Sequence, residues 1–313
     1  MGGFAVKKIY ILVFLVIIFF PVLFIGLKGD ERSGVVSDKL KVITSVNILE
    51  DFVKEIGGEK VEVESLITGL ETPHTFSMSP GDRKKLMEAD MIVTIGMGLE
   101  VWIDDILKEI ASEKIIVTTS RVPGIKVIGG SVDDEHGHDN HNHGNPHIWL
   151  NPDNARLMIT AIKDSLIKAD PVNKEYYTKN YKYYLSELNT EILELKNRVA
   201  RLDDRRVFSY AAAFPYLLDY FGFETPLPSR VVPGQDISAR EITSLIKQLK
   251  KEDIEVIIEA RQSGSKIAET LARETGGKVV YLTPLLIPEI IPETGSYKGL
   301  IRYNIETIIN VLK

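Results

Sequence analysis

Cysteine is absent from this chain of 313 residues, and its absence removes several possibilities at once. Without thiols the chain forms no disulfide bond, offers no thiolate to a metal ion and carries no lipid-modified cysteine. Positive charge is also in short supply, because 38 Lys and Arg stand against 44 Asp and Glu, for a net charge of −6. Binding to phosphate backbones requires a concentrated basic excess, so nucleic acid is not an expected partner.

One long apolar run lies near the N-terminus, at residues 9–27. About 20 apolar residues span a bilayer, whereas the hydrophobic part of a secretory signal is about 7 to 15 residues long. Because no small-residue cleavage site is evident after it, the run predicts an uncleaved membrane anchor, with a cleaved signal peptide as the alternative. Lys7 and Lys8 precede the run and are expected to stay in the cytoplasm, which places the rest of the chain outside the membrane.

From residue 41 onward, strand-like apolar runs alternate with helical periodicity, which predicts an α/β fold with parallel sheets covered by helices on both faces. Ser79, followed by Pro80 and Asp82, and Ser238, followed by Glu241, each predict the start of a helix. The length and the 44% hydrophobic content favour two lobes. Between them, apolar residues recur at steps of four and three from Tyr181 to Leu202, which predicts one long helix. We therefore expect two doubly wound lobes bridged by a long rigid helix. Fewer than four heptads are present, which argues against an oligomerising coiled coil and favours a monomer.

These patterns divide the chain into four segments. We expect an anchor or signal with a tether at 1–38, an N-terminal α/β lobe with a His-rich loop (133–145) at 39–150, a helical region at 151–203 and a C-terminal α/β lobe at 204–313. In doubly wound proteins, ligands bind beyond the carboxyl ends of the strands. A ligand is therefore expected in the crevice between the lobes.

Histidine is scarce, and its six residues all lie between His74 and His147. Four of them fall in the polar, acidic segment 133–145: His136, His138, His141 and His143. This segment has no apolar side chain to bury, so it predicts a solvated loop. Neutral imidazole is a preferred ligand of zinc and its neighbours, whereas calcium and magnesium prefer oxygen. The loop therefore predicts capture of a transition metal ion, with a merely polar surface loop as the alternative.

The remaining two histidines each follow a proline, which restricts the backbone and helps to aim the ring. His74 lies just beyond the predicted strand 61–67, and His147 immediately precedes a helix. Trp149 stands close enough in sequence to shield an imidazole from water. Alone, each would be an ordinary surface or buried histidine. Together, beside a His-rich loop, they are candidate metal ligands.

Five segments, 42–45, 56–58, 73–82, 96–102 and 145–152, together resemble the metal-binding class of periplasmic solute-binding proteins, the zinc and manganese receptors of ABC transporters. The resemblance extends over residues 41–312. It implies two α/β lobes bridged by a long helix, with the metal ion between them, and His74 and His147 as two of four ligands. It also implies binding of zinc, or of manganese as the second choice, and delivery to an ABC permease. Zinc-selective members often carry a His-rich acidic loop.

The C-terminal half departs from the family pattern at the other two ligand positions. Where the family has His or Glu this chain has Ala211, and where it has Asp this chain has Thr283. Alanine cannot ligate and threonine is a poor neutral donor. Glu259, at the end of a predicted strand, matches a family glutamate near the cleft and is the best substitute; an interlobe ion pair, for example with Arg261, is the alternative. Weaker candidates are Glu289, Glu293 and Tyr210.

Three classes of function fit some of these features. The first is a receptor that captures a divalent transition metal ion reversibly, with a pH dependence set by the imidazoles. The second is a diverged receptor for a metal chelate or another small solute, which would use the positions left open by Ala211 and Thr283. The third is a zinc hydrolase, but the sequence has neither a His-Glu-x-x-His helix nor a nucleophile elbow. No enzymatic activity is therefore expected, and an incomplete ligand set predicts weaker or less selective binding.

Overall fold

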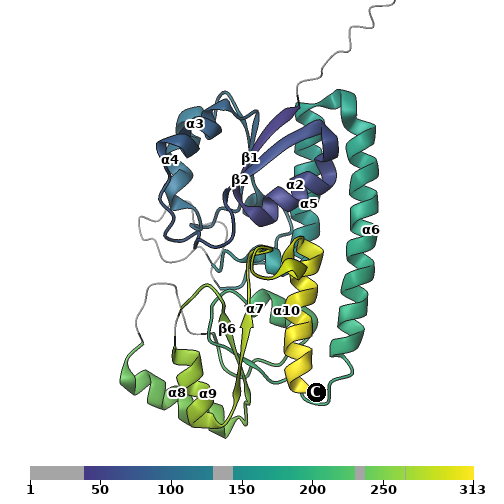
Figure 1. Ribbon diagram of the computed structural model, residues 1–313. Helices are drawn as coiled ribbons and strands as arrows, with labels where there is room; N and C mark the ends of the chain where they lie inside the picture. Colours follow the sequence, from purple (N-terminus) through teal and green to yellow (C-terminus); the bar gives the residue numbers. More distant parts are fainter. Residues whose placement is uncertain (1–38, 130–143, 230–236, 265) are drawn as a thin grey trace, which may run out of the picture. The chain divides into compact units, whose positions relative to one another are not determined.

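The structure is a computed structural model that describes residues 39–129, 144–229, 237–264 and 266–313 (Figure 1). The predicted anchor at 9–27, with Lys7 and Lys8, lies outside the described residues. So do the four loop histidines, His136, His138, His141 and His143. No helix in the described part of the chain has the length and apolar character needed to cross a membrane.

The first sheet has four parallel strands in the order β2-β1-β3-β4. They are β1 (Leu40–Val46), β2 (Val61–Ile67), β3 (Met91–Thr94) and β4 (Ile115–Thr118). Val42 of β1 lies opposite Val63 of β2 on one side and Met91 of β3 on the other. Since all four strands run the same way, their carboxyl ends meet at one edge, where a doubly wound sheet binds its ligand.

Helices of this half are α2 (Asn47–Gly57), α3 (Pro80–Glu88), α4 (Asp104–Ile110) and α5 (Pro152–Ala169). The predicted start of α3 is confirmed: the Ser79 hydroxyl accepts from the Asp82 backbone N–H, and the Asp82 carboxylate accepts from the Ser79 N–H. Such a capping box satisfies two backbone donors that a helix start leaves unpaired. At the other end of α2, Gly58 takes a φ of 50°, which favours glycine and stops the helix.

The second sheet has three parallel strands in the order β5-β6-β7. These are β5 (Phe208–Ser209), β6 (Val256–Ala260) and β7 (Lys278–Leu282), and the helices of this half are α7 (Pro215–Phe221), α8 (Ala239–Lys251), α9 (Ile267–Thr275) and α10 (Tyr297–Leu312). Ile257 packs in the core of α8 and α9, whereas its neighbours Val256 and Ile258 pack in the core that contains α10. This alternation puts helices on both faces of the sheet, as Figure 1 shows.

The predicted long helix is α6 (Lys174–Val199), 26 residues long. Its buried stripe consists of Tyr177, Tyr184, Leu188, Ile192, Leu195 and Val199. Of the expected apolar positions, Tyr181 and Leu185 lie in the helix, partly buried against the same core, whereas Leu202 lies beyond the end of the helix. Tyr181 lies on the inward face of the helix, about one turn before Tyr184 and Leu185, and its hydroxyl shares a hydrogen bond with the Thr160 hydroxyl of α5 at 2.9 Å. The helix contacts α2 and α5 of the first half and α10 of the second, so it is the expected strut.

Residues 39–313 form one compact unit, and one hydrophobic core runs through both halves. Hydrogen bonds also join them. The Asn47 side chain donates to the Leu286 carbonyl at 2.8 Å, and the Tyr297 hydroxyl donates to the Trp149 carbonyl at 2.7 Å. The Trp149 indole in turn donates to the Pro284 carbonyl at 2.8 Å. These contacts bring the segment that follows β7 against the segments that carry the candidate ligands.

Candidate metal site

His74 and His147 lie side by side, although 73 positions separate them in the sequence. His74 follows β2, His147 precedes the 3₁₀ turn η4 (Ile148–Leu150), and their ring centroids are 5.5 Å apart with a tilt of 53°. A tetrahedral ion bound at about 2.0–2.1 Å by one nitrogen of each ring holds the ring centres about 5 Å apart. The spacing therefore suits a shared ion.

The Asn145 side chain fixes the orientation of His147. Its Oδ1 accepts from the His147 backbone N–H at 3.1 Å and from the ring Nδ1 at 2.8 Å. Its Nδ2 donates to the Ala212 carbonyl at 2.6 Å, which settles which end of the amide is the oxygen. Because Nδ1 carries the proton, the lone pair is on Nε2, the tautomer that a metal ion needs at that nitrogen.

Both imidazoles are neutral at physiological pH. Burial lowers the pKa of His147 to about 3, with a smaller contribution from the neighbouring His74, and burial also lowers the pKa of His74. Among the described residues, the buried Nε2 of His74 has no hydrogen-bond partner. A neutral ring with an unshared nitrogen lone pair needs no deprotonation before it binds a cation.

Tryptophan and glutamate side chains support the segment that carries His74. Trp102 donates its indole N–H to the Pro73 carbonyl at 2.9 Å, and its ring packs against Phe76 at 4.7 Å. The turn before Trp102 is held by Glu100, whose carboxylate accepts from the Ile95 and Gly96 N–H groups and from the Ser45 hydroxyl. Burial raises the pKa of Glu100 to about 7 against these hydrogen bonds. The segment 96–102 is therefore a support for the site.

Ala211 and Thr283 offer no ligand. Ala211 has a methyl side chain, and its carbonyl accepts from the Ser209 hydroxyl at 2.7 Å. Thr283 is fully buried; its hydroxyl donates to the Leu285 carbonyl at 2.7 Å and accepts from the Leu285 N–H at 3.3 Å. The same oxygen also accepts from Gln262 Nε2 at 2.8 Å. Its hydrogen and lone pairs are thus all engaged within the protein.

Glu259 ends β6 with only 1% of its surface exposed. One carboxylate oxygen accepts from the Ala260 N–H at 2.7 Å, whereas Oε2 has no partner in the part of the chain that is described. Burial raises the pKa of this carboxyl. Burial, with a smaller contribution from the neighbouring Glu259, also raises the pKa of Tyr210 to about 12. Arg261 forms no ion pair with Glu259; its guanidinium lies over the Tyr281 ring and donates to the Tyr303 hydroxyl.

Over the described ranges, no three His, Cys, Asp or Glu side chains come together in a way that could hold a metal ion. Glu259 thus does not join the histidine pair as a preformed third ligand, and its ligand role stays a prediction. Glu289 and Glu293 are exposed in the segment after β7.

Two side chains near the site were missed from the sequence. Asn145 stands two residues before His147 in the segment 145–152, so its spacing was a usable signal. Gln262 stands three residues beyond Glu259 and donates to Thr283; its buried Oε1 lacks a hydrogen-bond partner within the described residues. Carboxamides carry no charge and follow no periodicity, so Gln262 gave no comparable signal.

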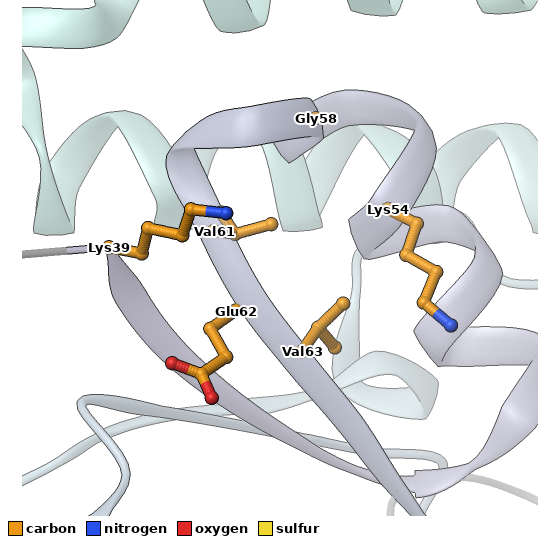
Figure 2. A pocket seen from close by; sticks show the side chains of 6 residues that line it. All are labelled: Lys39, Lys54, Gly58, Val61, Glu62 and Val63. Carbon is orange, nitrogen blue, oxygen red and sulfur yellow. The ribbon is translucent and has the colours of Figure 1, made fainter.

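A surface hollow lies at the opposite end of β2 from the histidines. It is lined by Lys39, Lys54, Gly58, Val61, Glu62 and Val63. Figure 2 shows its three charged side chains pointing in different directions. They do not converge on one point, so this hollow offers no coordinated set of ligands.

Two parallel sheets joined by a long helix form the scaffold, and the candidate site on it is a pair of neutral imidazoles. The sequence model of the zinc-uptake complex component A, a periplasmic component, matches residues 42–311. The chain belongs to this family of metal-binding periplasmic solute-binding proteins of ABC transporters.

Relatives and a solved structure agree with this assignment. The chain is 30% identical over 321 residues to the zinc-binding protein AdcA of Streptococcus pyogenes serotype M3, a match that covers 96% of this chain and 61% of the relative. It is 31% identical over 266 residues to the high-affinity zinc uptake system protein ZnuA of Bacillus subtilis, with 82% of each chain covered. The Mn-bound periplasmic metal binding protein from candidatus liberibacter asiaticus has a TM-score of 0.71 and 26% identity, over 88% of this chain and 100% of that one.

Proposed function

We propose that this protein is an extracytoplasmic receptor that captures a zinc ion between His74 and His147 and passes it to an ABC permease. The observation that carries the proposal is the pair of neutral imidazoles 5.5 Å apart, one of them held in a defined tautomer by Asn145. The lobes would be residues 39–150 and 204–313, with 151–203 between them. The apolar run 9–27 would tether the receptor outside the membrane, by the expectation drawn from its length.

Zinc is favoured over manganese by the chemistry of the donors. Two imidazole nitrogens suit zinc, whereas manganese prefers carboxylate, carbonyl and water oxygens. Two relatives are named for zinc, and one structural relative holds manganese, so the family accommodates both ions. The chain spans about 61% of the length of the AdcA relative.

The proposal is tested by equilibrium zinc binding to the full-length protein in detergent, measured by competition with a chromophoric chelator. Three forms are compared: the wild type, His74→Ala, and a form in which His136, His138, His141 and His143 are all replaced by Ala. We expect the loop form to retain one site of wild-type affinity and His74→Ala to lose it. Loss of all binding in the loop form, with an unaffected His74→Ala, would show that the loop and not the histidine pair holds the ion.

A metal chelate or another small solute is the second candidate ligand. It is favoured because neither Ala211 nor Thr283 offers a ligating side chain, and a chelate brings its own donor atoms and needs fewer from the protein. The same titration separates the two functions. If the wild type shows no saturable binding of free zinc at micromolar concentration, the chelate receptor is preferred.

Transport is tested in cells that lack the protein and grow under zinc limitation imposed by a chelator. Growth restored by the wild-type chain, but not by His74→Ala at equal expression, is the result expected if the bound ion is delivered to a permease. Equal rescue by both forms would contradict the proposal.

A further inference from the structure

Gln262 presents a buried oxygen that the protein itself leaves unpaired. Thr283 has one hydroxyl hydrogen, and it goes to the Leu285 carbonyl at 2.7 Å. The contact with Gln262 at 2.8 Å must therefore be donated by the Gln262 amide. This fixes the orientation of the carboxamide, with Nε2 toward Thr283 and Oε1 on the other side. Oε1 is buried and, in the described part of the chain, without a hydrogen-bond partner.

A buried carbonyl oxygen without a partner costs about 1–3 kcal/mol, so such an atom requires an explanation, and a bound ion is one. Three buried side-chain atoms in the described residues are in this state: His74 Nε2, Glu259 Oε2 and Gln262 Oε1. The two oxygens carry lone pairs, and so does His74 Nε2 in the tautomer protonated at Nδ1; a cation satisfies lone pairs, whereas a hydrogen-bond acceptor does not. No lysine or arginine nitrogen is among these three atoms.

A closed chain of contacts connects Gln262 with the histidine pair. The His147 ring packs on Trp149 at 5.3 Å, and the Trp149 indole donates to the Pro284 carbonyl. The neighbouring Thr283 binds Gln262, whose Nε2 also approaches the Gly69 carbonyl at 3.4 Å. Gly69 lies in the segment that leads from β2 to His74, and the His74 ring faces His147.

We infer that Gln262, oriented by Thr283, supplies its carboxamide oxygen to the metal ion that His74 and His147 bind. This inference rests on the proposed function. Thr283 then acts without touching the ion: it occupies the family's carboxylate position and positions the oxygen that replaces that carboxylate. The second half then contributes a neutral oxygen, and Glu259 is the nearest carboxylate to it in the sequence. A mixed set of imidazole and carbonyl donors accepts manganese more readily than a set of imidazoles alone.

The test uses the full-length protein with the four loop histidines replaced, so that only the histidine pair is measured. Gln262→Met keeps the length of the side chain and removes the oxygen, and Gln248→Met, on α8, is the matched control. We expect Gln262→Met to weaken zinc binding about 10-fold or more and to change the visible spectrum of bound cobalt(II), while Gln248→Met changes neither. Thr283→Val should weaken zinc binding in the same way, and Thr283→Ser should not.

The double variant separates positioning from general destabilisation. If Thr283 acts through Gln262, Thr283→Val causes no further loss of affinity in the Gln262→Met background. If Gln262→Met lowers the unfolding temperature of the metal-free protein, Gln262→Glu decides, because it keeps an oxygen at this position. Affinity at or above the wild-type value supports the inference, and a loss as large as that of Gln262→Met overturns it.

Two results distinguish the failure of this inference from the failure of the proposed function. If Gln262→Met binds zinc and cobalt(II) as the parent does, while His74→Ala abolishes binding, the receptor function stands and the role of Gln262 is refuted. If the parent protein binds no zinc, both are refuted together.

Discussion

The two sheets of this protein share the same hydrogen-bonded turn at their strand ends but differ in the candidate ligating side chains near those ends. At four positions near strand ends a hydroxyl donates to the carbonyl two residues further on: Thr44, Ser65, Ser209 and Thr283. The segments around the first sheet then contribute the imidazoles His74 and His147, whereas the second sheet has Ala211 and Thr283 at the corresponding family positions. Turn geometry at a strand end thus does not determine whether a ligand stands there.

The two tryptophans give the largest expected effect, because one bridges the halves and the other does not. Trp149 is fully buried and donates to Pro284 of the second half, while Trp102 is partly buried and donates to Pro73 of its own half. We expect Trp149→Ala to lower the free energy of unfolding by about 3–5 kcal/mol, and Trp102→Ala by clearly less. Urea unfolding of the metal-free proteins measures both. Equal losses would show that the contact between the halves adds no stability.

The zinc affinities of two variants compare the predicted ligands of the two halves directly. We expect His147→Ala to weaken zinc binding about 100-fold or more, because it removes a buried nitrogen already held in the required tautomer. Glu259→Gln, which replaces one carboxylate oxygen by an amide, should weaken it about 10-fold. Competition with a chromophoric chelator measures both affinities. If Glu259→Gln proved the more harmful, the second half rather than the first would dominate binding.

The sequence predicted the features that depend on local residue patterns, and it did not predict the contacts that depend on tertiary packing. Alternating periods predicted both sheets and α6, and the capping residues Ser79 and Ser238 predicted two helix starts, all from neighbours in the chain. His74 and His147 were found because imidazole is chemically distinctive. Gln262 was missed because its orientation depends on two acceptors distant in the sequence, the Thr283 hydroxyl and the Gly69 carbonyl, which no local pattern brings together.

Titration of His147 and titration of Asp51 should change the stability of the protein in opposite directions. His147 has a pKa of about 3 in the folded protein and about 6.5 in the unfolded chain, so the unfolded state binds more protons between these values. Stability of the metal-free protein should therefore fall as the pH drops below 6.5, by up to about 1.4 kcal/mol per pH unit. His147→Gln should remove this contribution. Denaturant unfolding from pH 4.5 to 7 measures the slope, and an unchanged slope in the variant would contradict the assignment.

Asp51, at the contact between α2 and α10, should behave in the reverse sense. Its carboxylate accepts from the Tyr297 N–H at 2.9 Å, and burial raises its pKa from 3.8 to about 7. The folded state then binds more protons than the unfolded state between pH 3.8 and 7, so stability is lost as the pH rises through this range. Asp51→Asn keeps an oxygen for Tyr297 and should stabilise the protein at pH 8 by about 1–3 kcal/mol. The same variant should differ little from the wild type at pH 4.5, which serves as the control.

The smallest expected effect tests whether the halves unfold together. Each half starts one helix with a capping box: Ser79 with Asp82 on α3, and Ser238 with Glu241 on α8. Replacing either serine by alanine should cost about 1 kcal/mol, and replacing it by asparagine only a few tenths. Because one hydrophobic core includes residues from both sheets, both alanine variants should shift a single cooperative thermal transition by a similar amount. If Ser238→Ala instead shifted only one of two resolved calorimetric transitions, the second half would be an independent folding unit, and a loss of affinity in Gln262→Met could then reflect the stability of that half alone.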